Sequence, residues 1–391
     1  MSKTPRLGVW FAATAMIFFT RALLFATWQS RSPEVMQLLH LDKAQMGLLV
    51  MLYPAGGLLG ILFANSLTNR FGPGKLTVVG FSLAALSLAG LGISVPAGNV
   101  WISGLFLLGM GLPMAIADFT GNYEGTEVDK RAKRSLFPAI HASFGVGMML
   151  AAAFSGMLIG SNQGLDLNYF VVAVVVAVGS IWAGLVFPKH SGETVSAESK
   201  RATAALGRKV WTERRTLAIA LIGFSFIMAE ISAGTWVPIA LNTSGFSGAE
   251  AANAFGLFWV VITLTRGVGG FVVDAIGRFG AILLSTLVTS AGIAIFILDS
   301  VIHQPYLGLI LWGAGLALGF PMSVNSMSDN PAMSAARINM IITVVYISSI
   351  SVGPVLGTIG QQFGIYFAFG VPLVLMVISA LLSRATKPEK L

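Results

Sequence analysis

The stretch GFVVDAIGRFG, residues 270–280, has a second and weaker copy earlier in the chain, NSLTNRFGPGK at residues 65–75. In both copies an apolar run ends in a polar turn that contains arginine and glycine. Asp274 of the later copy corresponds to Asn69 of the earlier one, 205 residues before it. Self-similarity at a fixed offset indicates an internal repeat. We therefore predict two similar halves, each carrying this turn at the same place.

Composition places both halves in a membrane. Of the 391 residues, 55% are hydrophobic and only 10% are charged, whereas a soluble domain carries roughly 25% charged residues. A soluble fold of this length cannot hide so much apolar surface. The formal net charge of +8 is therefore interpreted through the positive-inside rule rather than as a nucleic-acid footprint. The chain has no cysteine, which excludes disulfides and Cys-ligated metals.

The apolar runs predict twelve transmembrane helices, since one span needs about 20 apolar residues and open sheets cannot cross lipid. Residues 188–215 form the only long polar segment and divide six spans from six. This predicts an N-terminal six-helix bundle over 1–187, a cytoplasmic linker over 188–215 and a C-terminal six-helix bundle over 216–391. The predicted spans begin near Leu7, Ala44, Leu76, Val100, Phe137, Leu167, Leu217, Ala251, Phe279, Tyr306, Ile338 and Ile365.

The basic residues predict the orientation. With the N-terminus inside, 20 of the 24 lysines and arginines fall in inside segments, as the positive-inside rule requires. Both termini are then cytoplasmic, and the basic and apolar N-terminus is an uncleaved first span. We expect a multi-pass protein of the bacterial inner membrane.

These features resemble the major facilitator superfamily over nearly the whole chain. Its G-x-x-x-D-x-x-G-R pattern stands in the later copy as Gly270, Asp274, Gly277 and Arg278. The earlier copy is degraded and keeps Arg70 and a glycine. Within the superfamily, the stretches at 25–50 and 117–147 are similar to the YbjJ/MosC-type subgroup. The resemblance implies two pseudo-symmetric six-helix bundles, alternating access and a small polar solute, with one branch linked to rhizopine.

Glu230 stands in the nearly uncharged stretch FSFIMAEISAG, residues 224–234. A lone buried carboxylate costs several kcal/mol unless it is paired or protonated. Arg21 lies at a similar depth in the first span. In the architecture that the resemblance implies, spans one and seven face the central cavity. We expect Arg21 and Glu230 to line it, with Glu230 as the proton carrier; the alternative is a fixed ion pair that only locks the halves together.

Other polar and aromatic residues complete the predicted sites. Trp28 and Trp236 either stack on the substrate or belong to the interfacial aromatic belt. Asn122 and His141 are predicted to form a polar cluster at the cavity floor or part of a gate, and Asn325 to hydrogen-bond the substrate. A cytoplasmic gate is expected, in which Asp118 and Glu127 pair with Arg70 or Lys75. The full predicted gate set is Arg70, Asp118, Glu127, Arg266, Asp274 and Arg278.

Together these patterns predict a secondary active transporter for a small polar organic solute, with proton-coupled uptake. Two alternatives stay open: a proton-driven exporter of small amphipathic compounds or drugs, and a non-transporting membrane sensor. No catalytic set or phosphate-binding loop is present in the sequence, so we expect no enzyme activity and no ATP drive. We expect no cofactor and no metal site. The expected partners are the substrate, a proton and the lipid bilayer, without nucleic acid, and the expected state is a monomer.

Overall fold

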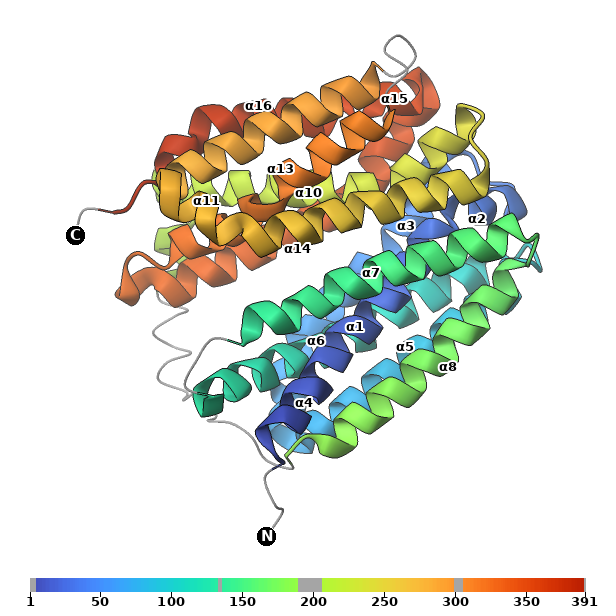
Figure 1. The fold of residues 1–391 in the computed structure, drawn as a ribbon, viewed down its shortest axis with the longest axis horizontal. Helices are drawn as coiled ribbons and strands as arrows, with labels where there is room; N and C mark the ends of the chain where they lie inside the picture. Colours follow the sequence, from blue (N-terminus) through green and yellow to red (C-terminus); the bar gives the residue numbers. More distant parts are fainter. Residues whose placement is uncertain (1–4, 133–135, 189–205, 299–304, 390–391) are drawn as a thin grey trace. The chain divides into compact units, whose positions relative to one another are not determined.

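The computed structural model describes residues 5–132, 136–188, 206–298 and 305–389. Over these residues the regular structure is helical, and no strand occurs (Figure 1). Eleven of the helical segments are long and apolar enough to cross a membrane. One of them, α11 (Gly248–Ile297), has 50 residues and a non-helical glycine, Gly277, inside it. Since 50 helical residues would extend about 75 Å, α11 contains two spans, and the predicted total of twelve is confirmed.

The chain forms two compact units. Unit 1 comprises residues 1–194 and 234–256, and unit 2 comprises residues 195–233 and 257–391. The first unit thus contains the last part of α10 (Arg214–Thr243) and the first turns of α11. The predicted bundle boundaries at 187 and 216 follow the sequence repeat, and they stay a prediction. Residues 189–205 of the predicted linker lie outside the described residues.

The other helices of unit 1 form its core by packing in pairs. The helix α4 packs along α6, α5 along α8, and α1 along α7; Figure 1 shows α5 and α8 side by side. Small residues permit the α4–α6 contact, because a Cβ atom on Gly60 would stand 2.1 Å from the backbone oxygen of Leu112. These helices are α1 (Leu7–Ser30), α2 (Ser32–Leu38), α3 (Lys43–Val50), α4 (Leu52–Phe71), α5 (Pro73–Ser94), α6 (Val100–Ala132), α7 (Phe137–Gly160) and α8 (Leu165–Val186).

Unit 2 contains most of α10 and α11 together with the helices that follow. Its core at one end is a cluster of buried side chains that includes Val210, Ile219, Met333 and Ile341. Besides α10 and α11, the elements are α13 (Pro305–Met327), α14 (Pro331–Phe363), α15 (Ile365–Ala368), α16 (Gly370–Leu382) and the 3₁₀ turn η1 (Ser383–Thr386).

The two turn motifs share one backbone conformation. Gly72, after α4, has φ 81° and ψ 154°, and Gly277, inside α11, has φ 68° and ψ 169°. Only glycine adopts this region without strain. The two glycines are 205 residues apart, the offset of the repeat. The turn between two successive spans therefore requires a glycine at this position in each half, because the chain reverses direction there with a positive φ.

The predicted helix starts agree closely with the structure except for α14, which begins at Pro331 rather than near Ile338. The short helix α2 was not predicted, because seven residues are too few for a periodic pattern. The second span is broken at Met51 into α3 and α4, whereas α14 continues as helix through Pro354 to Phe363.

Candidate functional site

An ion pair lies deep within the helices of unit 1. Arg21 Nη1 donates to Asp118 Oδ1 at 2.8 Å, joining α1 to α6. Arg21 lies about 21 Å along α1 from Leu7, at 1.5 Å per residue. Its side chain is 36% exposed and that of Asp118 is 24% exposed. A charged pair facing lipid is costly, so this partial exposure favours a polar space beside the pair.

Aromatic rings and a histidine surround this pair. The Arg21 guanidinium stands 5.2 Å from the centroid of the Phe144 ring, within cation–π range. The His141 ring packs against Phe18, with ring centroids 4.5 Å apart. Asn122, one turn after Asp118, donates to the backbone oxygen of that residue. The structure thus brings Arg21, Asp118 and Asn122 together, and places His141 and Phe144 on α7 beside α1.

A second ion pair lies in unit 2. Glu230 of α10 accepts from Arg266 Nη2 of α11 at 3.4 Å, and both side chains are partly exposed. Arg266 is also held by its Nε, which donates to the backbone oxygen of Ala317 in α13 at 3.2 Å. Glu230 is therefore tolerated in an apolar helix because Arg266, about one helical turn before the motif, compensates its charge.

Arg21 and Glu230 occupy corresponding positions in the repeat. Ser143 Oγ donates to the backbone oxygen of Ala15, and Ser348 Oγ donates to that of Phe224. The serines are 205 residues apart and their acceptors 209 apart, which is also the separation of Arg21 and Glu230. Corresponding positions of the two halves thus carry opposite charges.

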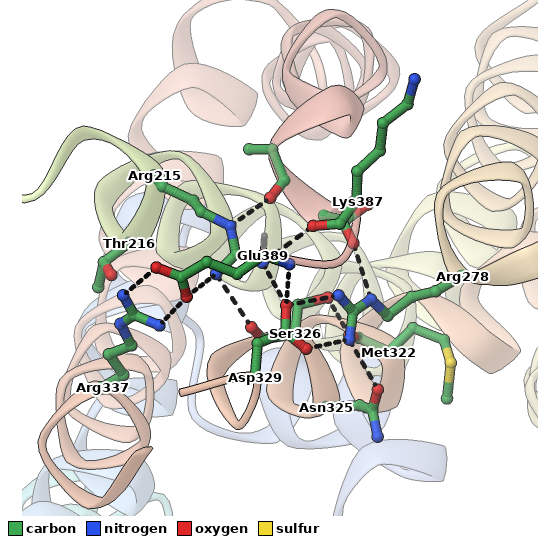
Figure 2. A network of polar contacts seen from close by, with 12 residues as sticks. Arg215, Thr216, Arg278, Met322, Asn325, Ser326, Asp329, Arg337, Lys387 and Glu389 are labelled. Atoms are coloured by element: carbon green, nitrogen blue, oxygen red, sulfur yellow. Dashed lines mark hydrogen bonds and ion pairs between the residues drawn. The ribbon is translucent and has the colours of Figure 1, made fainter. Parts of the chain in front are cut away.

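A larger network of charges lies at one end of unit 2 (Figure 2). Arg278, the arginine of the repeated motif, holds Asp329 through two hydrogen bonds of 2.8 and 2.7 Å. Arg215 Nη2 donates to the same carboxylate at 2.6 Å. These bonds, with Arg278 the largest contributor, lower the pKa of Asp329 from 3.8 to about 2. We call Arg215, Arg278, Arg337, Glu213, Asp329 and Glu389 the arginine–carboxylate network.

Arg337 is the most deeply buried member of this network. Its side chain is 1% exposed, and it donates to Glu213 and Glu389 at 2.5 and 2.7 Å. Burial raises the pKa of the Glu213 carboxyl, but hydrogen bonds from Arg337 and Thr216 outweigh it, so the net pKa of Glu213 is lowered. The sequence alone does not single out these three residues. Glu213 and Glu389 stand next to other charges, and Arg337 is an isolated arginine in a segment predicted to be cytoplasmic.

Several predicted partners differ from those in the structure. Asp118 pairs with Arg21, where Arg70 or Lys75 had been expected. Glu127 pairs with Lys130, three residues on, at 2.7 Å, and Arg70 lies over the ring of Phe71. Which acid an arginine meets depends on the rotation of each helix about its axis, and no sequence pattern here records that rotation.

The remaining predicted residues are placed as follows. Asn325, predicted for the cavity, accepts from Arg278 Nη1 at 3.1 Å and so belongs beside the network. Asp274 is exposed. Trp28 and Trp236 are 2% and 0% exposed, so neither belongs to a lipid-facing belt. Burial alone does not test whether either residue contacts a substrate.

One buried acid was not among the predicted site residues. Glu124 of α6 is fully buried, and its Oε2 accepts from the Trp10 indole at 2.7 Å. It corresponds to Asp329 by the repeat offset of 205. The correspondence is visible in the sequence, but only the structure shows that Glu124 lies inside α6, which ends at Ala132, whereas Asp329 lies beyond the end of α13 at Met327.

The comparisons with known proteins assign the family. The model described as Major Facilitator Superfamily matches residues 9–354, and the chain belongs to this superfamily. It is 25% identical to an uncharacterized MFS-type transporter of Yersinia pestis, covering 95% of this chain and 94% of the relative. It is 22% identical to the membrane protein MosC of Rhizobium meliloti, covering 96% and 91%. The resemblance to the MosC-containing subgroup is thereby confirmed.

Solved structures agree with the fold. A bacterial homolog of the human lysosomal transporter Spinster superposes with a TM-score of 0.81 at 15% identity, covering 99% of this chain and 98% of that one. A D-xylose–proton symporter superposes with a TM-score of 0.72 at 15% identity, covering 98% and 99%. These similarities show that the chain has the major facilitator fold. The apolar helices and the family match together support a multi-pass membrane protein.

Proposed function

We propose that this protein is a secondary active transporter that takes up a small polar organic solute together with protons. The observation that carries the proposal is the placement of two partly exposed ion pairs, Arg21–Asp118 and Glu230–Arg266, within membrane-spanning helices. Ionisable groups at such depth are costly and usually mark substrate or proton pathways. Each arginine can bind an anionic or hydroxylated group of a solute, and each carboxylate can accept a proton.

The chemistry of the two ion pairs supports coupled movement of solute and proton rather than binding of the solute alone. Each carboxylate is held by an arginine. A solute that binds the same arginine competes with the carboxylate for it, and the released carboxylate is the group that we propose carries the proton. Solute and proton would thereby load together, as a symporter requires. The D-xylose–proton symporter of the same fold supports this class of mechanism by analogy only.

The predicted orientation completes the proposal. Both termini lie in the cytoplasm, the arginine–carboxylate network stands at the cytoplasmic end of unit 2, and the membrane is the bacterial inner membrane. We further propose that the protein works as a monomer and has no enzyme activity. The basis for the orientation is the distribution of lysines and arginines.

A thermal-stability screen tests the substrate class without a prior assay, because a ligand that prefers the folded state stabilises it. The purified protein is heated with polyols, amino sugars, amino acids, nucleobases or cationic drugs. We expect a polar solute to raise the melting temperature, and Arg21→Ala and Glu230→Gln to reduce that shift. Stabilisation by hydrophobic cations alone would favour the exporter instead. Glu250→Gln is the matched control, since Glu250 is an exposed carboxylate bonded only to Ser247.

A further inference from the structure

The segment that follows α16 is held against unit 2 by arginine side chains. Arg215 Nε and Nη2 donate to the backbone oxygens of Ala385 and Lys387 at 3.0 and 3.1 Å. Arg278 Nε donates to the backbone oxygen of Thr386 at 2.7 Å. Arg215 lies at the start of α10, and Arg278 directly follows Gly277 in α11. Three successive carbonyl groups of one segment thus accept from two different helices.

Glu389 anchors the far end of the segment. Its Oε2 accepts from Arg337 Nη1 at 2.7 Å and from Arg215 Nη1 at 3.3 Å, and its Oε1 accepts from Arg337 Nη2 at 3.3 Å. Its backbone N–H donates to Asp329 Oδ2 at 3.2 Å. Figure 2 shows Glu389 pointing toward both guanidinium groups. One side chain therefore joins the segment to α10 and α14 together.

Charge balance makes Glu389 essential to this arrangement. The network contains three arginines and three carboxylates, and Glu389 is the only carboxylate supplied by the segment after α16. Without it, three guanidinium groups share Glu213 and Asp329. Arg337 is 1% exposed, so water cannot readily replace the lost carboxylate. Removing one partner from a buried pair is costly for this reason.

The remaining contacts of the segment are small. Ala385 packs on the apolar cluster of Val210, Ile219, Met333 and Ile341. The side chains of Ser383 and Thr386 are buried but short, and their hydroxyls donate to nearby backbone oxygens of the same stretch of chain. The Lys387 ammonium lies 4.9 Å from the centroid of the Phe279 ring but is exposed to solvent. Short side chains and an exposed cation–π contact contribute less than charged hydrogen bonds, so the carbonyl bonds and the Glu389 carboxylate are the main attachment.

We propose that residues 383–389 form a detachable strap, which ties the starts of α10 and α14 and the Gly277 turn of α11 into one body while the Glu389 carboxylate sits between Arg215 and Arg337. When that carboxylate is neutralised, the strap detaches from unit 2. The three helix ends can then move independently of one another. The lowered pKa of Glu389, caused chiefly by its hydrogen bond from Arg337, is consistent with a docked strap at neutral pH. The strap does not depend on which solute is carried.

Cysteine labelling tests the attachment directly, because the chain has no cysteine of its own. Thr386 belongs to the strap and is fully buried while the strap is docked, so Thr386→Cys should react slowly with a water-soluble maleimide. In the background of Glu389→Gln we expect labelling to be at least about tenfold faster, because the local opening needed for reaction becomes easier. Glu389→Asp, which keeps the charge, should restore much of the protection.

Two controls separate release of the strap from general loss of structure. Arg384→Cys is exposed in the docked strap and should react equally fast with either residue at 389. Ser383→Cys, at a second buried position, should repeat the result for Thr386→Cys if that substitution itself disturbs the strap. Equal, slow labelling of the buried cysteines in Glu389→Gln would overturn the proposal.

Hydrogen exchange tests the consequence for the helices. In Glu389→Gln, amides near Arg215, Arg278 and Arg337 should exchange faster than in the parent protein, while the rest of unit 2 stays unchanged. Glu250→Gln, which removes a carboxylate elsewhere, should leave all three regions unchanged. Unchanged exchange at all three helix ends would refute their coupling through the strap, even if the buried cysteines became reactive.

Discussion

Arg21 illustrates what a single residue contributes and how far sequence can define its role. Its depth in the first span follows from counting residues. Because it is a charged residue in an apolar helix, the sequence predicts that it either takes part in function or pairs with an opposite charge. Its partner is 97 residues away, in α6. Only the rotation of α1 against α6 decides that Asp118, rather than another acid, meets the guanidinium. The position of a charge is therefore predictable here, whereas its partner is not.

The first prediction concerns this pair. Arg21→Ala and Asp118→Asn should show a coupling free energy of about 0.5–3 kcal/mol in a double-mutant cycle of thermal or denaturant stability. The reason is that each single change leaves the other charge unpaired within the helices. Glu230→Gln and Arg266→Ala should couple less strongly, because their atoms are 3.4 Å apart rather than 2.8 Å. Additive effects for Arg21 and Asp118 would mean that the two do not interact.

The second prediction concerns the close approach of α4 to α6. Gly60→Ala should destabilise unit 1 by about 1–3 kcal/mol, the usual cost of overpacking, because the new methyl group meets backbone rather than a movable side chain. Gly8→Ala is the control, since a Cβ atom there has nothing within 4 Å. It should be neutral or slightly stabilising in the same melt. A harmless Gly60→Ala would argue against the helix packing described.

At the scale of the elements, apolar length and turn glycines predicted the fold well. The spans begin within a few residues of the predicted positions, except α14, which begins at Pro331 rather than near Ile338. A proline at the first helical position explains this earlier start. The network was less accessible to sequence reasoning. Glu213 lies just before α10, Arg215 and Arg337 lie in the first two turns of α10 and α14, Arg278 and Asp329 lie at turns, and Glu389 lies beyond α16. Only the folded chain brings these residues together.

The third prediction is the pH dependence of the network. The pKa of Asp329 is depressed from 3.8 to about 2, so its stabilisation is fully present above about pH 4 and is lost as pH falls toward 2. The gap in melting temperature between the parent and Asp329→Asn should therefore stay constant from pH 8 to about 5 and shrink only in stronger acid. A gap that closed already near neutral pH would show that Asp329 is not held ionised by Arg278.

The fourth prediction concerns Arg337 and its acids. Glu213→Gln removes the bond of 2.5 Å to a guanidinium that is 1% exposed. It should cost about 1–3 kcal/mol, because the buried guanidinium keeps Glu389 but loses one of its two charged acceptors. Glu250→Gln should cost far less, since that carboxylate is exposed. Comparison of the two variants in one denaturant series separates loss of a buried pair from loss of a surface charge.

For the whole molecule, the central claim is that solute and proton move together and that both ion pairs, one in each unit, take part in binding them. The most direct measurement is solute-driven proton uptake into proteoliposomes, followed with an internal pH dye and the polar solute that gives the largest thermal shift. The account predicts that an inward solute gradient acidifies the lumen, and that Asp118→Asn and Glu230→Gln abolish this while the fold stays intact. Solute entry without acidification, or acidification unchanged in both variants, would contradict it.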